Sequence, residues 1–117
     1  MSDEVTMYHN PRCSKCRTTL ELLKTRGKDP QLVEYLNTPP TAETLAAILD
    51  MLGIEPRELM RKHEKEYAEA GLGNEDLSRN DLIAAMVKHP RLIERPIVIA
   101  NGKATIGRPP EKVLDIL

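Results

Sequence analysis

Both cysteines of the chain lie in one short stretch between Tyr8 and Arg17, and basic residues stand on either side of them. The stretch follows a short apolar run and precedes a helical pattern, so it places Cys13 and Cys16 at the start of a helix. A thiol at a helix start among cations is stabilised as the thiolate, which is the nucleophilic form. The stretch therefore predicts a thiol-based redox or oxyanion-handling enzyme.

The two cysteines have different expected roles. Cys13 stands between Arg12 and Ser14, which is a poor setting for a small buried apolar residue, so we expect it to be the reactive thiol. Cys16 follows one helical turn later on the same face. Two interpretations of Cys16 remain open: it resolves an intermediate on Cys13 by forming a disulfide, or it is a core residue in register with the leucines that follow.

A metal centre is not expected. Structural zinc takes four ligands, and this chain offers two cysteines and three scattered histidines, His9, His63 and His89. His63 lies in a charged run and His89 at a helix end, so both are expected to be structural or solvated.

Three arginines are candidate ligands for an anion. Arg95 directly precedes Pro96 and an apolar strand, from where it could reach an anion bound at Cys13. Arg61 heads a charged run, and Arg108 lies in a stiff turn that contains two prolines. A single arginine is more often a surface residue than a ligand, so these three form a site only if the fold brings them together.

Length and charge limit the class of protein. The chain has 117 residues, which suits one domain, and its 17 basic and 18 acidic side chains give a net charge of −1. That balance argues against a general binder of nucleic acid or of membrane surfaces. The sequence has no secretory signal pattern and no apolar run of membrane-spanning length. We therefore predict a cytoplasmic protein, where a close pair of cysteines indicates redox, catalytic or metal chemistry.

The first third of the chain predicts a βαβ unit. Val5–Tyr8 is a short strand pattern, a helix runs from Cys13 to Arg26-Gly27, and residues 32–36 form a second apolar strand pattern. Two strands joined by one helix within so few residues should be parallel, with a right-handed crossover.

The remainder predicts a helical block and then a hairpin. Helical signals begin at Thr41 and continue to about residue 92, including a charged stretch at 62–70 that we interpret as a solvated helix or turn. Residues 96–100 are an almost continuous apolar run typical of an interior strand, and Asn101-Gly102 is a strong hairpin signal. A terminal helix follows. This order predicts an α/β, thioredoxin-like fold with a four-stranded mixed sheet, in a single domain 1–117 with a helical insertion at about 41–92.

Four separated motifs resemble one known family, the glutathione/glutaredoxin-coupled arsenate reductases of the ArsC family. The resemblance runs from Val5 to the terminal helix and is far more specific than Cys-x-x-Cys alone. The motifs are His9-Asn10-Pro11-x-Cys13, Leu59-Met60-Arg61, Arg95-Pro96-Ile97-Val98 and Gly107-Arg108-Pro109.

The resemblance implies a reaction and a set of roles. Cys13 would attack arsenate, while Arg61, Arg95 and Arg108 would hold the oxyanion through paired hydrogen bonds. The family reaction continues through a thiol–arsenate adduct, attack by glutathione as co-substrate, and reduction of the mixed disulfide by glutaredoxin, releasing arsenite. No bound cofactor is implied.

The same resemblance assigns supporting residues. His9 and Asn10 would orient or stabilise the thiolate, and Pro96 matches a position that is usually cis in thioredoxin folds. The position of Cys16 is a serine in these reductases, where it hydrogen-bonds the catalytic thiolate.

Two alternatives follow from these residues. The Cys13–Cys16 pair resembles that of Spx-type regulators, which are redox-switched and bind RNA polymerase. A general glutathione-linked thiol oxidoreductase is the other alternative, and it would not need Arg61 or Arg108.

Overall fold

The structure is a computed structural model that describes residues 4–117. It divides into two compact units. One combines the chain up to Thr38 with Arg95–Leu117, and the other is Pro39–Glu94. The helical insertion expected at about 41–92 falls within the second unit. That the two units form a single domain stays a prediction.

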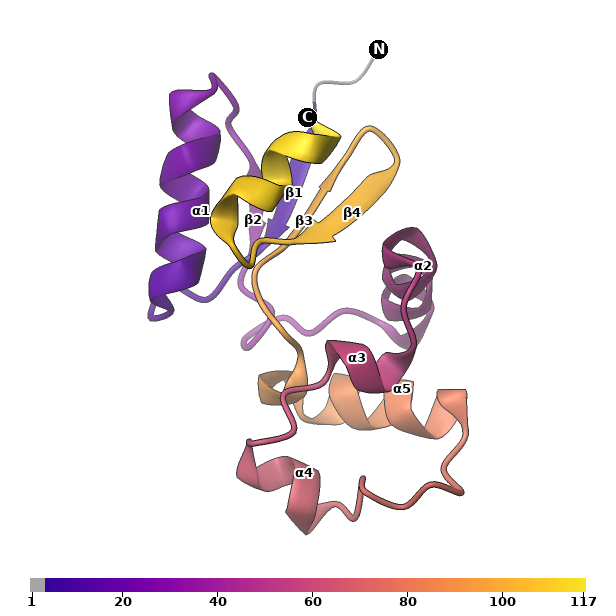
Figure 1. Cartoon of the computed structure of the whole chain (residues 1–117). Coiled ribbons are helices and arrows are strands. Elements are labelled where there is room, and N and C mark those ends of the chain that lie inside the picture. Colours follow the sequence, from indigo (N-terminus) through magenta and orange to yellow (C-terminus); the bar gives the residue numbers. More distant parts are fainter. Residues whose placement is uncertain (1–3) are drawn as a thin grey trace. The chain divides into compact units, whose positions relative to one another are not determined.

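The first unit contains a four-stranded mixed sheet in the order β2-β1-β3-β4 (Figure 1). Strands β1 and β2 are parallel, as the βαβ pattern predicted, and the other two pairings are antiparallel. This is the sheet of a thioredoxin-like fold, and it confirms the predicted fold class. The strands are β1 (Val5–Tyr8), β2 (Gln31–Val33), β3 (Ile97–Ala100) and β4 (Lys103–Ile106).

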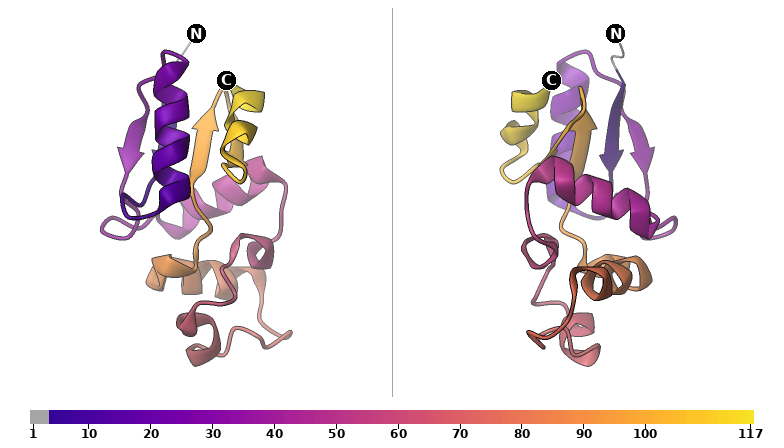
Figure 2. Two further views of the ribbon diagram at one scale, coloured as in Figure 1. Left: turned by 60° about the vertical axis from the view of Figure 1, so that its left-hand side comes forward. Right: turned by 90° about the vertical axis from the view of Figure 1, so that its right-hand side faces the viewer.

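Two helices, α1 (Ser14–Thr25) and η2 (Pro110–Ile116), lie side by side against one face of this sheet (Figure 2). The buried residues of helix α1, Cys16, Thr19 and Leu23, recur at helical spacing, so they form one face that packs against the sheet. The resulting core includes both cysteines and side chains from β1, β3 and η2: Val5, Met7, Cys13, Cys16, Leu23, Val98, Ala100, Val113 and Ile116.

The second strand is shorter than the sequence indicated. It ends at Val33, and the chain then turns, with the N–H groups of Asn37 and Thr38 both donating to the carbonyl of Glu34 at 2.9 Å. The predicted strand is confirmed at Leu32 and Val33, but its predicted end at residue 36 was wrong, since Tyr35 is fully buried within this turn and is not paired in the sheet. Periodicity counts buried apolar positions and does not report which backbone groups pair.

The hairpin between β3 and β4 confirms the turn prediction. Asn101 and Gly102 have φ angles of 54° and 72°, the left-handed values that a two-residue type I′ turn needs at both central positions. The Asn101 side chain also donates to the carbonyl of Ile116 at 2.9 Å, which ties the turn to the end of η2. The terminal helix is a 3₁₀ helix.

The second unit is helical, and its boundaries carry the expected signals. Thr41 caps the first helix by accepting from the Thr44 N–H, and Gly53 ends that helix at φ 68°. Ser78 and Asp81 form a capping box at the start of the fourth. The helices are α2 (Ala42–Leu52), α3 (Pro56–Leu59), α4 (Lys65–Glu69), α5 (Arg79–Lys88) and η1 (Pro90–Leu92).

The charged stretch at 62–70 is a mostly exposed helix and turn, as predicted, but two of its carboxylates are partly covered. It contains α4, but the side chains of Glu64 and Glu66 are only 15% and 13% exposed, and both pair with Arg91 at 3.8 and 3.7 Å. A run of charges in sequence does not show which of its members a neighbouring element will cover.

Thr19, on the buried face of α1, provides a test of packing in the first unit. Its hydroxyl is fully buried and has no hydrogen-bond partner among the described residues. Thr19→Val replaces that hydroxyl by a methyl group of similar shape, so we expect the free energy of unfolding to rise by about 1 kcal/mol. Urea denaturation measures the change, and an equal or lower midpoint would contradict the assignment of an unsatisfied hydroxyl.

Candidate active site

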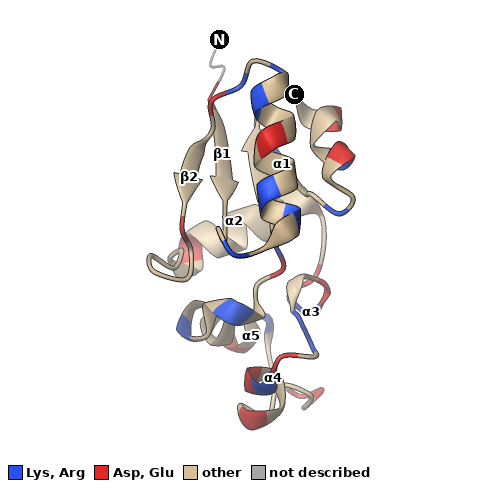
Figure 3. Ribbon diagram, turned by 90° about the vertical axis from the view of Figure 1, so that its left-hand side faces the viewer, with Lys and Arg blue, Asp and Glu red and all other residues tan. Residues whose placement is uncertain are grey.

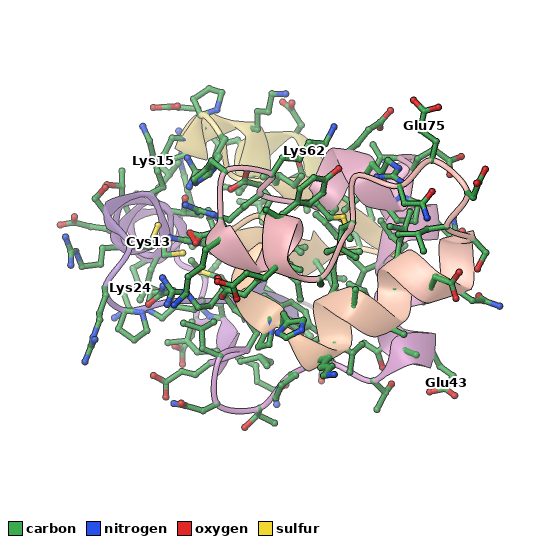
Figure 4. The ribbon with its side chains drawn as sticks, turned by 90° about the horizontal axis from the view of Figure 1, so that it is seen from below. Cys13, Lys15, Lys24, Glu43, Lys62 and Glu75 are labelled. Carbon is green, nitrogen blue, oxygen red and sulfur yellow. The ribbon has the colours of Figure 1, made fainter. Side chains whose placement is uncertain are left out.

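Cys13 is the N-cap residue of α1, at the end of the loop that follows β1. Its backbone is extended, with φ −90° and ψ 123°; its N–H donates to the Asn10 carbonyl at 2.9 Å and its carbonyl accepts from Arg17 N–H at 3.1 Å. The loop thus delivers the sulfur to the positive end of the helix, where unpaired N–H groups favour an anion. Figure 4 labels Cys13 together with Lys15 and Lys24 of the same helix.

The Cys13 thiol is activated. Burial opposes its ionisation, but interactions with the Cys16 backbone N–H, the Arg95 side chain and the Cys16 thiol outweigh burial and lower the pKa of Cys13 to about 7. The thiolate is therefore favoured near neutral pH over its share in an ordinary cysteine. The Cys13 residue is 9% exposed, at the edge of the core.

The flanking cations that first suggested this chemistry do not supply the activation. Basic positions gather at the first turn of α1 (Figure 3), but Arg12, Lys15 and Arg17 are exposed, and none of them is among the main causes that lower the pKa of Cys13. The charge that does so belongs to Arg95, a residue distant in sequence.

Cys16 is the third residue of α1 and is fully buried. Burial, followed by the charge and hydrogen bonding of Cys13, raises the pKa of Cys16 to about 12, against the opposing effect of the Asn10 backbone N–H. Both cysteines are free thiols. Cys16 is therefore a protonated donor toward Cys13, and it also belongs to the core.

Arg95 reaches the site from the segment that leads into β3. Burial acts to lower the pKa of Arg95, but the hydrogen bond to Cys13 and the proximity of Tyr35 have the larger effect and raise it above its ordinary value. The guanidinium is therefore a permanent cation beside the sulfur. The Arg95–Pro96 bond is cis, which confirms the expectation for Pro96.

Arg108 lies next to Arg95. Its Nε donates to the Arg95 carbonyl at 2.8 Å, and the Gly107 N–H donates to the Pro96 carbonyl at 2.9 Å. These bonds join two of the motifs, so the structure brings Cys13, Arg95 and Arg108 together in one unit.

Gly107 allows this approach because it has no side chain. A Cβ at this position would lie 2.8 Å from Thr19 Oγ1 and 2.9 Å from Pro96 Cγ. Such contacts are too short for carbon, so the turn can lie against α1 and the Arg95–Pro96 segment only with glycine at this position.

His9 and Asn10 hold the loop. The His9 N–H donates to the Val33 carbonyl at 2.9 Å, and burial lowers the pKa of His9 despite the opposing charge of Glu34. His9 is thus predominantly neutral near neutral pH. Asn10 accepts from the N–H groups of Cys13 and Arg12, at 2.9 and 3.0 Å. Asn10 orients the cysteine loop, whereas His9 is not among the main causes that lower the pKa of Cys13.

Arg61 lies in the second unit, just after α3. Its N–H donates to the Leu92 carbonyl at 2.7 Å, and its guanidinium lies 3.0 Å from His63 Nε2 and 3.7 Å from carboxylates of Glu64 and Glu94. Its side chain is only 12% exposed. The role of Arg61 in holding an oxyanion stays a prediction.

A hollow of about 540 Å³ adjoins the cysteine loop. It is lined by His9, Pro11, Leu32, Val33, Glu34, Asn37 and Thr38. Across residues 4–117, no group of three or more His, Cys, Asp or Glu side chains is placed to hold a metal ion. Within the same residues, every helix is too short or too polar to cross a membrane.

Sequence reasoning missed one residue of the site, Tyr35, and one contact, that between Gly107 and Thr19. Tyr35 lies near Arg95 and raises its pKa, and Gly107 packs on Thr19. A tyrosine in a chain with 3% aromatic residues was a weak signal for Tyr35. The contact between Gly107 and Thr19 had no signal, because it joins two segments far apart in sequence.

Comparison with known proteins gives consistent results. The model of the ArsC family matches residues 8–116. The chain is 56% identical to the uncharacterised protein YfgD of Escherichia coli K12, over 100% of this chain and 99% of that one. It is 46% identical to an arsenate reductase of Neisseria meningitidis serogroup A, over 97% and 98% of the two chains. The solved structure of an arsenate reductase from Vibrio cholerae is 51% identical, with a TM-score of 0.96 and full coverage of both chains. The site described above, an activated cysteine at a helix start with two arginines beside it, agrees with these matches. The chain belongs to the ArsC family.

Proposed function

We propose that the protein is a cytoplasmic arsenate reductase that forms a thiol–arsenate adduct on Cys13 and takes its electrons from glutathione and glutaredoxin. The observation that carries the proposal is the Cys13 thiol, whose pKa is lowered to about 7 with a hydrogen bond from Arg95. An anion-binding guanidinium beside a nucleophilic sulfur is the arrangement that attack on an oxyanion needs. Relatives that carry the name arsenate reductase support the choice of substrate.

In the first step the Cys13 thiolate attacks the arsenic atom of arsenate. A sulfur–arsenic bond forms, an arsenic–oxygen bond breaks, and the departing oxygen leaves as water after protonation. Arg95 and Arg108 donate to the remaining oxygens, and Arg61 is the third donor in this proposal. Arsenic stays in its oxidised state until this point, so the adduct must next receive two electrons.

Two thiols supply those electrons when they become a disulfide. Glutathione is the small thiol of the proposal, and glutaredoxin returns the oxidised sulfur to the thiol state. The hollow beside His9 and Pro11 is of a size suited to a small peptide ligand. We propose that glutathione approaches Cys13 from this side.

The test is production of arsenite from arsenate with glutathione, glutaredoxin, glutathione reductase and NADPH present. We expect wild-type protein to release arsenite and Cys13→Ser to release none, because a serine hydroxyl is not ionised near neutral pH. Folding of both proteins is compared by circular dichroism. If wild type and Cys13→Ser are equally inactive with every reductant supplied, the proposal fails.

Arg108 separates this function from general thiol–disulfide exchange. Arg108 is not among the main causes that lower the pKa of Cys13, and it reaches Arg95 only through a carbonyl, so we expect Arg108→Ala to slow Cys13 alkylation far less than Arg95→Ala does. For arsenate, loss of a charged hydrogen bond worth about 1.5–3 kcal/mol should raise KM about tenfold or more. Steady-state kinetics with arsenate and with a glutathionylated peptide measure both effects. An equal loss on the two substrates would favour a general oxidoreductase.

A further inference from the structure

We propose that Cys16 is the resolving thiol of the reaction: it attacks Cys13 in the adduct, releases arsenite, and leaves a Cys13–Cys16 disulfide. This inference rests on the proposed function and changes the order of its steps. Glutathione and glutaredoxin then act after arsenite has left, on a disulfide within the protein.

The position of Cys16 is the first argument. Cys13 is the N-cap of α1 and Cys16 the third helical residue, and residues three apart on a helix share one face. The two side chains already hydrogen-bond to each other, with Cys16 as the protonated partner. The second sulfur is therefore in contact with the first before any substrate arrives, as intramolecular attack requires.

Burial is the second argument. Cys16 has 0% exposure and Cys13 has 9%, so an external reactant meets the Cys13 sulfur first. A thiol that solvent cannot reach is inert toward outside oxidants. Its one neighbouring thiol among the described residues is Cys13. The only thiol with which Cys16 can react in the folded protein is therefore Cys13.

The charge on Cys13 affects when Cys16 can lose its proton. After burial, the effects that keep Cys16 protonated are the charge of Cys13 and the hydrogen bond to it. Once the Cys13 sulfur is bonded to arsenic it is no longer a thiolate, so the hydrogen bond that holds the Cys16 proton on a sulfur anion is lost. The Asn10 N–H and the Arg95 charge, which favour ionisation of Cys16, remain. The Cys16 proton can then pass to an oxygen of the adduct as its sulfur attacks.

The step balances in atoms and electrons. Cys16 gives its proton to an oxygen of the adduct, and its sulfur attacks the Cys13 sulfur. The sulfur–arsenic bond breaks, and its electron pair stays on arsenic, which leaves as arsenous acid. Two thiols have become one disulfide, and arsenic has gained two electrons. A thiol reductant of the glutathione or glutaredoxin class restores both cysteines by exchange.

A single-turnover experiment tests the inference on the full chain. Reduced protein, freed of added thiol, is mixed with arsenate, and arsenite is measured together with the number of free thiols. We expect one arsenite per chain and loss of both thiols, with the Cys13–Cys16 disulfide located by peptide mass spectrometry. Cys16→Ser and Cys16→Ala should release no arsenite until glutathione is added.

A matched variant controls for thiol number. Cys16→Ser/Glu21→Cys keeps two cysteines but moves the second to an exposed position, eight residues from Cys13 and about 12 Å along the axis. That separation exceeds the span of about 7 Å that a disulfide can bridge. We expect this variant to behave as Cys16→Ser does.

Each outcome separates the two proposals. Arsenite from wild type only after glutathione is added would overturn the role of Cys16 and leave the proposed function intact. Arsenite without added thiol from the Cys16 variants would also overturn it. No arsenite from wild type under either condition would remove the proposed function, and the role of Cys16 with it.

Discussion

Arg95→Ala is expected to lower the alkylation rate of Cys13 near neutral pH about tenfold, because the thiolate loses a hydrogen bond and a positive charge. The pKa of Cys13 is about 7 with Arg95 present, and the ordinary value is 9.0. Removing the guanidinium moves the pKa toward that value, while the Cys16 N–H still favours the anion. The reactive fraction near neutral pH falls accordingly.

The sign of this effect depends on pH. Above the ordinary pKa of a thiol both proteins carry a thiolate, so their rates should converge. As pH falls toward 7, Arg95→Ala protonates first and the rates diverge. Iodoacetamide alkylation across this range, followed by mass spectrometry of the Cys13 peptide, gives the two titration curves. Cys16, with its pKa raised to about 12, should stay unmodified at neutral pH.

Arg12→Ala is the matched control for Arg95→Ala. Arg12 is adjacent to Cys13 in sequence, but it is exposed and is not among the main causes that lower the pKa of the thiol. We expect its alkylation curve to coincide with that of wild type. If Arg12→Ala shifts the curve as far as Arg95→Ala does, the activation belongs to the net charge of the loop, and the assignment to Arg95 is wrong.

Gly107→Ala is expected to destabilise the protein by about 1–3 kcal/mol, the range for overpacking a filled core. The added Cβ would lie 2.8 Å from Thr19 Oγ1 and 2.9 Å from Pro96 Cγ. Because Arg95 precedes Pro96, movement of that segment should also weaken the hydrogen bond to Cys13. We therefore expect a lower urea midpoint together with a slower alkylation of Cys13.

Gly73→Ala controls for the general effect of replacing a glycine. A Cβ at Gly73 meets nothing within 4 Å, and its backbone is not in the left-handed region, so its effect should stay within about 0.5 kcal/mol. Thr19→Ala combined with Gly107→Ala removes one of the two contacts and should recover part of the loss. Equal losses at Gly107 and Gly73 would show that the close approach to α1 is unimportant.

Local patterns predicted most of the elements correctly. The helix that begins after Cys13, the parallel β1–β2 pair and the Asn101-Gly102 turn all depend on period, capping or turn chemistry within a few residues. The strand predicted over 32–36 failed where burial and pairing diverge, since Tyr35 is buried in a turn. A periodic pattern predicts which side chains are buried, but it does not predict which backbone groups pair in the sheet.

The sequence by itself determined that Cys13 would stand at the positive end of a helix, because the turn at Asn10-Pro11 and the apolar period that follows are local. It also placed Cys16 on the same helical face. Neither the source of activation nor the pairing of Arg95 with Arg108 follows from spacing. Those depend on β3 lying beside β1 and on a glycine that lets distant segments touch. Electrostatic interactions act through space, so only the tertiary structure decided that Arg95, and not an arginine near the cysteine in sequence, would act on its sulfur.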